Sequence, residues 1–294
     1  MKRIGIYVKK NRPEALEVLR DLALWLSSRG IEVFAEEGIA EEIKGLPPEG
    51  FRNELDLVVV LGGDGTMLAA SRMLAGSRVP ILGVNLGGLG FLTALSREEL
   101  FLVMERILRG EFEIERRILL RVKVESLPGR EFTVLNDVVI NKGALARIIT
   151  ITAKVDGTYL TTFRGDGLIV STPTGSTAYC LAAGGPIVHP SLPAIVIVPI
   201  CPHTLTNRPL LVPEESVISL FHTSKEEDVY LTLDGQAGFR LPQGVTVEVS
   251  KAPGEVRLVK CPFRSYFDLL RTKLKWGGDL LTSGGGGPCW SPSE

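Results

Sequence analysis

The sequence predicts two structural parts, an N-terminal α/β domain with a parallel sheet and a C-terminal domain that is mainly antiparallel and sandwich-like. Apolar runs alternate with amphipathic helical stretches up to residue 112, as in βαβ units. The β-branched run Leu57–Leu61 stops at a glycine turn, which is typical of a buried parallel strand followed by a helix. From Glu113 onward the hydrophobic period becomes two residues, as on half-buried strands.

These patterns place the first domain at 1–112 and the β-rich domain at 113–259. An amphipathic helix within 260–282 is expected to return and cover the first domain. The glycine-rich tail, 283–294, is expected to be disordered.

Composition restricts the classes of function. The chain has 294 residues, 45% hydrophobic and 23% charged, with a formal net charge of −1. The lack of a global basic field argues against a nucleic-acid partner, and no apolar run approaches the ~20 residues of a membrane span. The four cysteines form no CxxC pair and the three histidines have no metal-binding spacing. We expect free thiols, no protein-bound metal, no membrane contact and a cytoplasmic location.

The first domain reads as strands that alternate with helices. One helix opens at Asn11 and Pro13 and ends at Gly30, and a capping-box pattern of Ser96 and Glu99 precedes another. Another helix is expected to run from the glycine turn through Ala75. The predicted strands are 4–8, 31–35, 57–61 and 81–84, and 36–53 is expected to be a loop with at most one helical turn.

The first candidate site is the turn Gly62-Gly63-Asp64-Gly65-Thr66. Glycines allow positive φ and close approach of a ligand, and free amides at a helix start favour an anion such as a phosphate. A carboxylate repels a phosphate unless it binds a metal or a hydroxyl or takes a proton, so Asp64 indicates chemistry. The spacing fits neither the P-loop nor the dinucleotide fingerprint. An ordinary βα turn is the alternative.

A second glycine loop, from Asn85 to Leu92, follows the next predicted strand. Ligands in open α/β sheets bind at the carboxyl ends of strands, so this loop is expected to face the first glycine turn across a site. A surface turn without function is the alternative.

The second domain is predicted from alternation such as Ile118, Leu120 and Val122, with Arg117 and Arg121 on the opposite parity. Asp156-Gly157 is a hairpin signal. The predicted strands are 114–124, 132–140, 148–155, 158–163, 168–171, 194–199, 217–221, 229–233, 245–249 and 256–259, and a helix is predicted at 265–276.

Polar groups interrupt these strands in two places. Asn136 and Asp137 are strand neighbours, so at least one should meet the interior, where a carboxylate needs partners. They form either a bulge or Asx-type turn, or a hydrogen-bonding pair for ribose hydroxyls or adenine nitrogens. The stretch Thr172–Tyr179 offers hydroxyls, amides and a ring that suit a nucleoside, the alternative being a helix N-cap with polar neighbours.

Together these motifs resemble the NAD kinase family. The first glycine turn is shared with diacylglycerol, sphingosine and 6-phosphofructo-kinases, so alone it indicates phosphoryl transfer and no particular substrate. Thr172–Tyr179 with Gly184-Gly185-Pro186 looks like the NAD kinase signature, and Asn136-Asp137 like the family's Asn-Glu/Asp pair. Similar later motifs are Pro202-His203-Thr204-Leu205, Arg208-Pro209 and Asp234-Gly235-Gln236. The resemblance runs from Ile4 to about Phe267, and the glycine-rich tail departs from it.

The resemblance implies an α/β nucleotide-kinase domain plus a β-sandwich-like domain. The implied reaction transfers the terminal phosphoryl group of ATP or polyphosphate to the 2′-hydroxyl of the adenosine ribose of NAD, giving NADP. Asp64 is assigned as the base, and Mg²⁺ is expected to accompany the donor. The backbone amides expected to hold phosphates are those of Gly62, Gly63, Gly65 and Thr66.

The same resemblance implies the contacts to NAD. They are expected from Asn136, Asp137, Thr174, Thr177, Ala178 and Tyr179, with Asp166 on the nicotinamide side; by its own position Asp166 could also cap a turn. Arg164 faces phosphates or forms a surface pair. Asp234 and Gln236 line the cleft or form a plain β-turn. Oligomers are common in the family, so a homodimer or homotetramer is expected.

Two other classes stay open at this point. A lipid kinase would share the phosphate turn but act on diacylglycerol or sphingoid bases. A non-catalytic NAD or NADP sensor would bind nucleotide without turnover, against which Asp64 argues. An assay of NAD with ATP and Mg²⁺ separates the three. The sequence leaves open ATP or polyphosphate as donor, acceptance of NADH and feedback by NADPH.

Overall fold

The computed structural model describes residues 1–9, 13–143, 147–204, 206–223 and 228–276. The predicted disordered tail, 283–294, lies outside these residues. No helix in the described ranges is long and apolar enough to cross a membrane.

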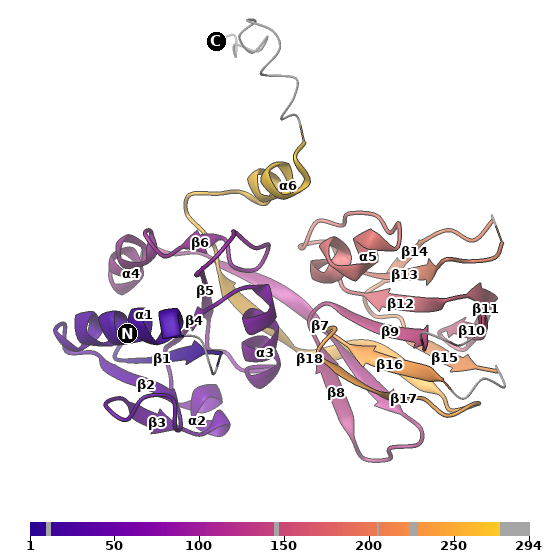
Figure 1. Cartoon of the computed structure of the whole chain (residues 1–294), viewed down its shortest axis with the longest axis horizontal. Helices are drawn as coiled ribbons and strands as arrows, with labels where there is room; N and C mark the ends of the chain where they lie inside the picture. Colours follow the sequence, from indigo (N-terminus) through magenta and orange to yellow (C-terminus); the bar gives the residue numbers. More distant parts are fainter. Residues whose placement is uncertain (10–12, 144–146, 205, 224–227, 277–294) are drawn as a thin grey trace, which may run out of the picture.

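The first half is a parallel sheet between two layers of helices (Figure 1). Its strands lie in the order β5-β4-β1-β2-β3, as predicted for βαβ units. The helices α1 and α4 pack on one face, and α2 and α3 on the other. The bounds are β1 Arg3–Val8, α1 Pro13–Ser27, β2 Glu32–Glu36, β3 Lys44–Leu46, α2 Pro48–Asn53, β4 Leu57–Leu61, α3 Asp64–Met73, β5 Ile81–Asn85, β6 Leu95–Ser96 and α4 Leu100–Leu108.

The direction of winding reverses between β1 and β4. The chain leaves β1 through α1 towards β2, and leaves β4 through α3 towards β5 on the other side. The loops after these two strands therefore diverge at their carboxyl ends. In open α/β sheets this switch point is where ligands bind.

Two predictions for this half were wrong in detail. Residues 36–53 contain β3 as well as α2, and a three-residue strand is too short to show alternation. The capping box at Ser96 does not open α4, which begins at Leu100 without a side-chain cap. Glu99 accepts the N–H of Ser96 at 2.9 Å but also pairs with Arg264, so its carboxylate serves a long-range contact.

The second half is built from two facing sheets with an apolar core between them. One is a separate six-stranded antiparallel sheet, β14-β13-β12-β9-β16-β17. The other continues the sheet of the first half through β18, where Leu258 pairs with Ile81 of β5. The bounds are β7 Ile114–Val124, β8 Glu131–Val134, β9 Asp137–Lys142, β10 Ile149–Val155, β11 Thr158–Gly165, β12 Gly167–Ser171, β13 Ala194–Ile200, β14 Leu210–Pro213, β15 Ile218–His222, β16 Val229–Leu233, β17 Ala237–Arg240 and β18 Val247–Val259.

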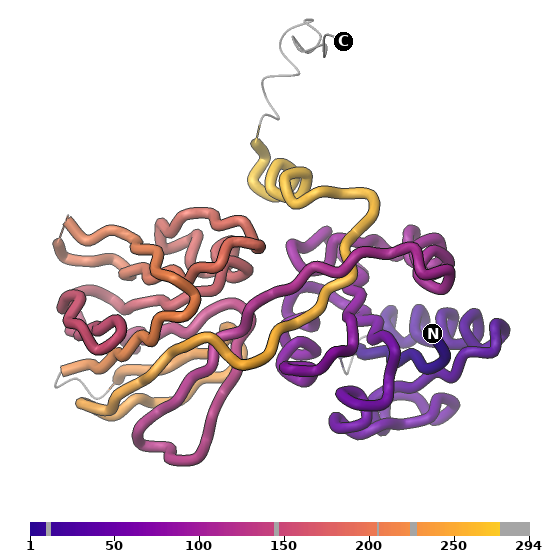
Figure 2. The backbone as a smooth tube through the Cα atoms, turned by 180° about the vertical axis from the view of Figure 1, so that it is seen from behind, coloured from indigo at the N-terminus to yellow at the C-terminus, as the bar shows by residue number. Residues whose placement is uncertain are grey.

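One twelve-stranded sheet therefore runs through both halves, and Figure 2 shows β7 and β18 side by side along the crossing. The two strands predicted at 245–249 and 256–259 are one strand, β18, whose pairing with β7 shifts register between Lys251 and Glu255. The single strand predicted at 132–140 is divided into β8 and β9. The domain limits at 112/113 and 259/260 stay predictions.

The C-terminal helix α6, Tyr266–Leu274, starts with a capping box formed by Ser265 and Asp268. We expected it to return to the first half, and its contacts reach both halves. Arg264, just before it, pairs with Glu99 at 2.8 Å, and the Tyr266 ring packs edge-on against His189.

Candidate functional site

A cavity of about 760 Å³, here called the glycine pocket, lies at the switch point between β1 and β4. Both glycine-rich segments contribute to it, which confirms that they face each other. Among the residues that line it are Tyr7, Lys9, Glu14, Gly62, Gly63, Asp64, Gly65, Thr66, Asn85, Gly87, Gly88, Gly90, Gln236 and Lys273.

Asp64 is the first residue of α3, and donors from the second glycine loop surround its carboxylate. Oδ1 accepts the N–H of Leu92 at 3.0 Å and both the N–H and the hydroxyl of Thr93, at 3.1 and 3.0 Å. Oδ2 accepts the N–H of Phe91 at 2.9 Å. Oδ2 thus keeps more capacity to accept a further hydrogen bond than Oδ1.

Asn85 ties this arrangement to the end of β5. Its Nδ2 donates to the Thr93 hydroxyl at 2.7 Å, and its Oδ1 accepts the N–H of Gly87 at 2.7 Å. Thr93 has no exposed surface. The relay from Asn85 through Thr93 to Asp64 fixes the orientation of the carboxylate.

The expectation that positive φ explains the first glycine turn is wrong, because none of Gly62, Gly63 and Gly65 takes positive φ. A Cβ at Gly62 would lie 2.4 Å from the Thr66 hydroxyl, and one at Gly90 would lie 2.0 Å from Asp64 Oδ1. A Cβ at Gly63 or Gly88 would meet nothing within 4 Å. These glycines therefore serve close packing in the first two cases and leave open space in the last two.

A second cavity of about 390 Å³, here called the sheet pocket, lies on the outer face of the six-stranded sheet. Asp137, Val139 and Asn141 alternate along β9 and share this face. The remaining lining residues are Asn136, Ala178, Tyr179, Thr232, Asp234 and Gly235. The side-chain oxygens of Asn136 and Asn141 are buried and have no hydrogen-bond partner among the described residues, so their capacity to accept a hydrogen bond is unused within the chain.

Asp137 is 4% exposed, and burial, followed by the negative charge of Asp234, raises its pKa to about 7. Near neutral pH its carboxyl group is therefore partly protonated. In that range it can either donate a hydrogen bond or accept one.

The break between β8 and β9 is stabilised by a residue that is distant in sequence. The buried carboxylate of Asp234 accepts the N–H groups of Leu135 at 3.1 Å, Asn136 at 2.7 Å and Asp137 at 3.3 Å. The interruption at Asn136-Asp137 is thus organised from outside its own strand. Arg72, on α3, pairs with Asp234 at 3.0 Å.

Asp234 and Gly235 form the turn between β16 and β17, with φ values of 50° and 62°. The predicted β-turn is therefore present, and its residues also line cavities, although Asp234 and Gln236 do not line the same one. Gln236 lines the glycine pocket, whereas Asp234 and Gly235 line the sheet pocket. The turn therefore lies between the two cavities.

The hydroxyl-rich stretch is divided between lining and support. Thr174 to Thr177 form a 3₁₀ turn, and α5, Tyr179–Ala182, follows. Ala178 and Tyr179 line the sheet pocket. Thr174, which is buried, and Thr177 line neither cavity. The Thr177 hydroxyl donates to the Thr174 carbonyl at 3.3 Å.

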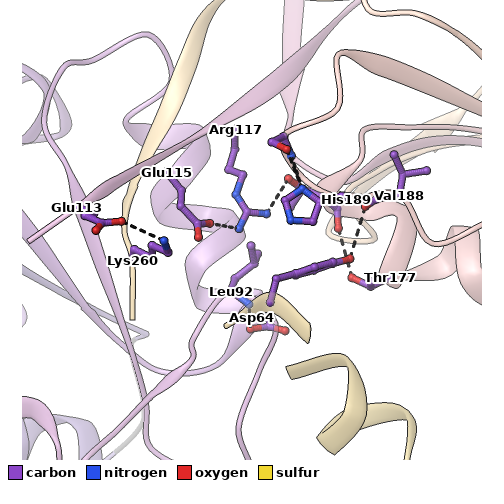
Figure 3. Close-up of polar contacts among 12 residues, drawn as sticks. Asp64, Leu92, Glu113, Glu115, Arg117, Thr177, Val188, His189 and Lys260 are labelled. Atoms are coloured by element: carbon purple, nitrogen blue, oxygen red, sulfur yellow. Dashed lines mark hydrogen bonds and ion pairs between the residues drawn. The ribbon is translucent and has the colours of Figure 1, made fainter. Parts of the chain in front are cut away.

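Arg117 lies behind Thr174 and was placed wrongly by the parity of its strand. It is 7% exposed, forms an ion pair with Glu115, and donates from Nη1 to the Thr174 hydroxyl at 3.4 Å (Figure 3). The predicted parity holds from Leu120 to Val124, but between Ile114 and Leu119 the buried side chains are those of the opposite parity, Arg117 and Leu119. The charge is tolerated there because its carboxylate partner is two residues away.

Arg164 and Asp166 are not brought to either cavity of the single chain. They lie where β11 passes into β12, at the opposite end of β12 from the Thr172 turn. Asp166 forms an ion pair with Lys142 at 3.1 Å. The contact of Asp166 to the nicotinamide side of NAD and that of Arg164 to phosphates stay predictions.

Sequence reasoning missed several residues of the two cavities and their supports. Lys9, Lys273 and Tyr7 carry no motif, and Arg72 and Thr93 act through partners far along the chain. Asn141 was detectable in principle, because it is a polar residue in an apolar strand on the same parity as Asp137.

Comparison with known proteins gives consistent matches over nearly the whole chain. The family model described as the ATP-NAD kinase N-terminal domain matches residues 4–112, and that of the ATP-NAD kinase C-terminal domain matches residues 135–261. The chain is 51% identical to proteins named NAD kinase from Syntrophotalea carbinolica and from Geobacter sulfurreducens, in each case over 94% of this chain and 99% of the relative.

Two solved structures have the same fold. A yeast NADH kinase complexed with NADH is 26% identical with a TM-score of 0.87, over 94% of this chain and 88% of that chain. An NAD kinase from Archaeoglobus fulgidus in complex with ATP is 27% identical with a TM-score of 0.75, over 93% of this chain and 98% of that chain.

Proposed function

The chain belongs to the NAD kinase family, and from this premise we propose how its two pockets divide the reaction. The reaction is phosphorylation of the 2′-hydroxyl of the adenosine ribose of NAD by ATP, which gives NADP. The glycine pocket holds the phosphoryl donor, and the sheet pocket, with the residues beside it, holds NAD.

The glycine pocket suits a phosphorylated donor. The positive end of the α3 helix dipole lies at the first glycine turn. The N–H groups of Gly62 and Thr66 already donate to the carbonyls of Val84 and Gly63, at 2.9 Å each, so the predicted phosphate contacts are left to the N–H groups of Gly63 and Gly65. Lys9 and Lys273 line the same cavity and form no ion pair among the described residues, so their charges are available to phosphates. Its volume of about 760 Å³ lies within the range of small-molecule sites.

Mg²⁺ is the cofactor we propose for the donor. Two carboxylates, Glu14 and Asp64, line the glycine pocket, and the described residues contain no cluster of three or more His, Cys, Asp or Glu residues that could hold a metal. This donor set fits a Mg²⁺ ion bound mainly by donor phosphates and water. When bound, the ion neutralises charge on the phosphates.

Asp64 is the residue that we propose as general base. It starts α3 in the donor cavity, its orientation is fixed through Oδ1, and Oδ2 is left with one hydrogen bond. This is the observation that carries the mechanism, because a base must be within hydrogen-bond reach of the hydroxyl that it deprotonates. The 2′-hydroxyl would give its proton to Oδ2 while its oxygen attacks the terminal phosphorus of ATP; the bond from this phosphorus to the bridging oxygen breaks, and ADP leaves with the electron pair.

The acceptor is recognised by the polar groups of the sheet pocket. The unpartnered oxygens of Asn136 and Asn141 accept hydrogen bonds, Asp137 donates or accepts, and Tyr179, 46% exposed, offers a ring for stacking. This polar lining favours a nucleoside over the acyl chain of a lipid. Thr174 and Thr177 line neither cavity and lie in the 3₁₀ turn that precedes Ala178 and Tyr179.

The experiment that tests this assignment replaces Asp64 by Asn. We expect single-turnover rates with NAD, ATP and Mg²⁺ to fall by ~10²–10⁴-fold, the usual contribution of general-base catalysis. The NAD dissociation constant from calorimetry should stay within a few-fold of wild type. Asp21→Asn, a carboxylate exposed on α1, is the matched control and should be unchanged.

Two results would contradict the base role. Near-wild-type turnover in Asp64→Asn would remove it outright. A loss of NAD binding proportionate to the loss of rate would make Asp64 a ligand contact instead.

Three further properties are proposed from the sequence. The donor is ATP, which Tyr7 and the apolar lining residues Leu61 and Leu86 could accept as a nucleoside in addition to its phosphates. The protein is cytoplasmic and forms a homodimer or homotetramer. Kinetics with polyphosphate in place of ATP, and light scattering of the purified chain, test the donor and the assembly.

A further inference from the structure

We propose that Arg72 is a positioning residue that sets the distance between the donor and the acceptor by holding the Asp234–Gln236 turn against α3. The inference rests on the division of pockets proposed above and adds a residue that neither cavity contains. Arg72 is not a member of either lining.

The first step in the argument is what Arg72 joins. One nitrogen of its guanidinium group donates to Asp234 Oδ2 at 3.0 Å and the other to the side-chain oxygen of Gln236. Gln236 in turn donates from Nε2 to the Gly65 carbonyl at 2.7 Å. The turn is thereby attached to α3 at both its beginning and its end.

The second step is where the two ends of this attachment lead. α3 begins with Asp64, so the helix that carries Arg72 also carries the proposed base. Asp234 accepts the N–H groups of Asn136 and Asp137, which are the proposed acceptor contacts. One arginine therefore joins the element that holds the base to the residues that hold the nucleoside.

The third step is electrostatic. The Asp234 side chain has no exposed surface, and Arg72 is its ion-pair partner among the described residues. Removing one partner of a buried pair leaves an uncompensated charge. An arginine suits this role because its planar fork can bind two acceptors at once, whereas lysine offers a point charge.

The expected consequence is a loss of rate with little loss of binding. Phosphoryl transfer depends mainly on positioning, and a misplacement of about 1 Å can cost ~10²-fold. Each pocket stays whole without Arg72, but their separation is no longer fixed. Arg72→Gln should therefore lower kcat about 10²-fold, with the NAD dissociation constant within threefold of wild type, and Arg72→Lys should recover part of the rate.

The test is a double-mutant cycle of Arg72→Gln and Asp234→Asn, with kcat, KM for NAD, calorimetric NAD binding and melting temperature measured for each protein. The double variant removes both charges and should regain melting temperature relative to Arg72→Gln, while kcat stays low. Arg78→Gln removes an exposed arginine just after α3 and is the matched control.

Several outcomes would overturn the proposal. Wild-type kcat in Arg72→Gln excludes a positioning role. Recovery of kcat together with melting temperature in the double variant reduces Arg72 to charge compensation. Loss of NAD binding equal to the loss of rate makes it an acceptor contact. If Arg72→Gln does not fold, the test uses Arg72→Lys, which keeps the positive charge. A wild-type kcat in Arg72→Lys would show that the two-acceptor contact of the guanidinium group is not needed for positioning.

A different variant tests the assignment of the donor to the glycine pocket and of NAD to the sheet pocket, independently of Arg72. If Asn136→Ala leaves the KM and the binding of NAD unchanged, the sheet pocket is not the acceptor site, whatever Arg72 does. A normal response of Asn136→Ala together with full turnover in Arg72→Gln refutes the positioning role alone.

Discussion

Asp137 is the residue at which stability and recognition oppose each other most directly. Its carboxyl group is buried beside a second buried carboxylate, Asp234, and its pKa is raised to about 7. An acid with such a pKa is kept in the native state at a cost to folding. Its position in the sheet pocket explains why an acid is present there at all.

We predict that Asp137→Asn stabilises the protein at pH 8 and has little effect near pH 4. The native pKa of about 7 lies above the unfolded value of about 4, so between these pH values the native state holds a proton that the unfolded state has released. Wild-type stability therefore falls as pH rises through this window, by up to about 4 kcal/mol.

Denaturant unfolding of both proteins at pH 4 and pH 8 measures this effect. Asp21→Asn, exposed on α1, controls for the loss of a carboxylate. Parallel pH dependence in Asp137→Asn and wild type would show that the group titrates normally in the folded protein.

Which site residues the sequence could reveal depends on how far away their partners are. Asp64 was found because it is a carboxylate in a glycine turn, and Asn136 and Asp137 because they interrupt an apolar run. Arg72 and Arg117 were not, because a charged residue on a helix or strand normally faces solvent. Arg72 contacts Asp234, which lies 162 residues further along the chain, and Arg117 contacts Thr174, which lies 57 residues further.

At the scale of elements, the two glycine loops act as one unit. The second loop supplies two amides, and Thr93 directly after it supplies a third amide and a hydroxyl, to the carboxylate that begins α3. Gly90 allows this contact, since a Cβ there would lie 2.0 Å from Asp64 Oδ1. The loop must remain close to Asp64 for the carboxylate to keep its orientation.

We predict that Gly90→Ala and Gly88→Ala behave differently although both lie in the same loop. The new methyl group at position 90 displaces Asp64, so turnover should fall at least ~10²-fold, as expected when a catalytic group moves by about 1 Å. The methyl group at position 88 meets nothing within 4 Å, so folding and the orientation of Asp64 should be kept.

Steady-state kinetics and melting curves of the two variants test this. Equal activity would mean that the loop moves freely away from Asp64 in solution.

Elements with a strong period were predictable, and short or paired ones were not. The strands β1, β4 and β5 and the helices α1 and α3 follow directly from apolar runs and their end signals. The four-residue strands β14 and β17 escaped because they lie at the two edges of their sheet, where burial imposes little pattern. β18 read as two strands because the residues at its register shift interrupt the alternation.

At the scale of the whole molecule, one sheet is continuous across the boundary between the halves. β18 pairs with β15 in one half and with β5 in the other, while β7 accompanies it along most of its length. The matched family models divide the chain into two regions, but the backbone hydrogen bonds cross between them.

We predict that the two halves unfold in a single cooperative transition. A shared sheet cannot lose one half without exposing strand edges of the other. Differential scanning calorimetry at fixed protein concentration should give one peak, with a calorimetric enthalpy close to the van't Hoff value. Two resolved peaks would show that the halves are thermodynamically separate.

The crossing of β7 and β18 also has a mechanical consequence. Two-domain enzymes that close like jaws usually bend at a few loop residues. Here the hydrogen-bonded strands β7 and β18 connect the two halves, and a rotation of one half against the other would have to bend both strands together. The register shift between Lys251 and Glu255 is where the ladder is already interrupted, so any flexing is concentrated there. The two strands therefore restrict large rotations of one half against the other, and the finer spacing of the two pockets is left to local contacts such as that of Arg72 with Asp234.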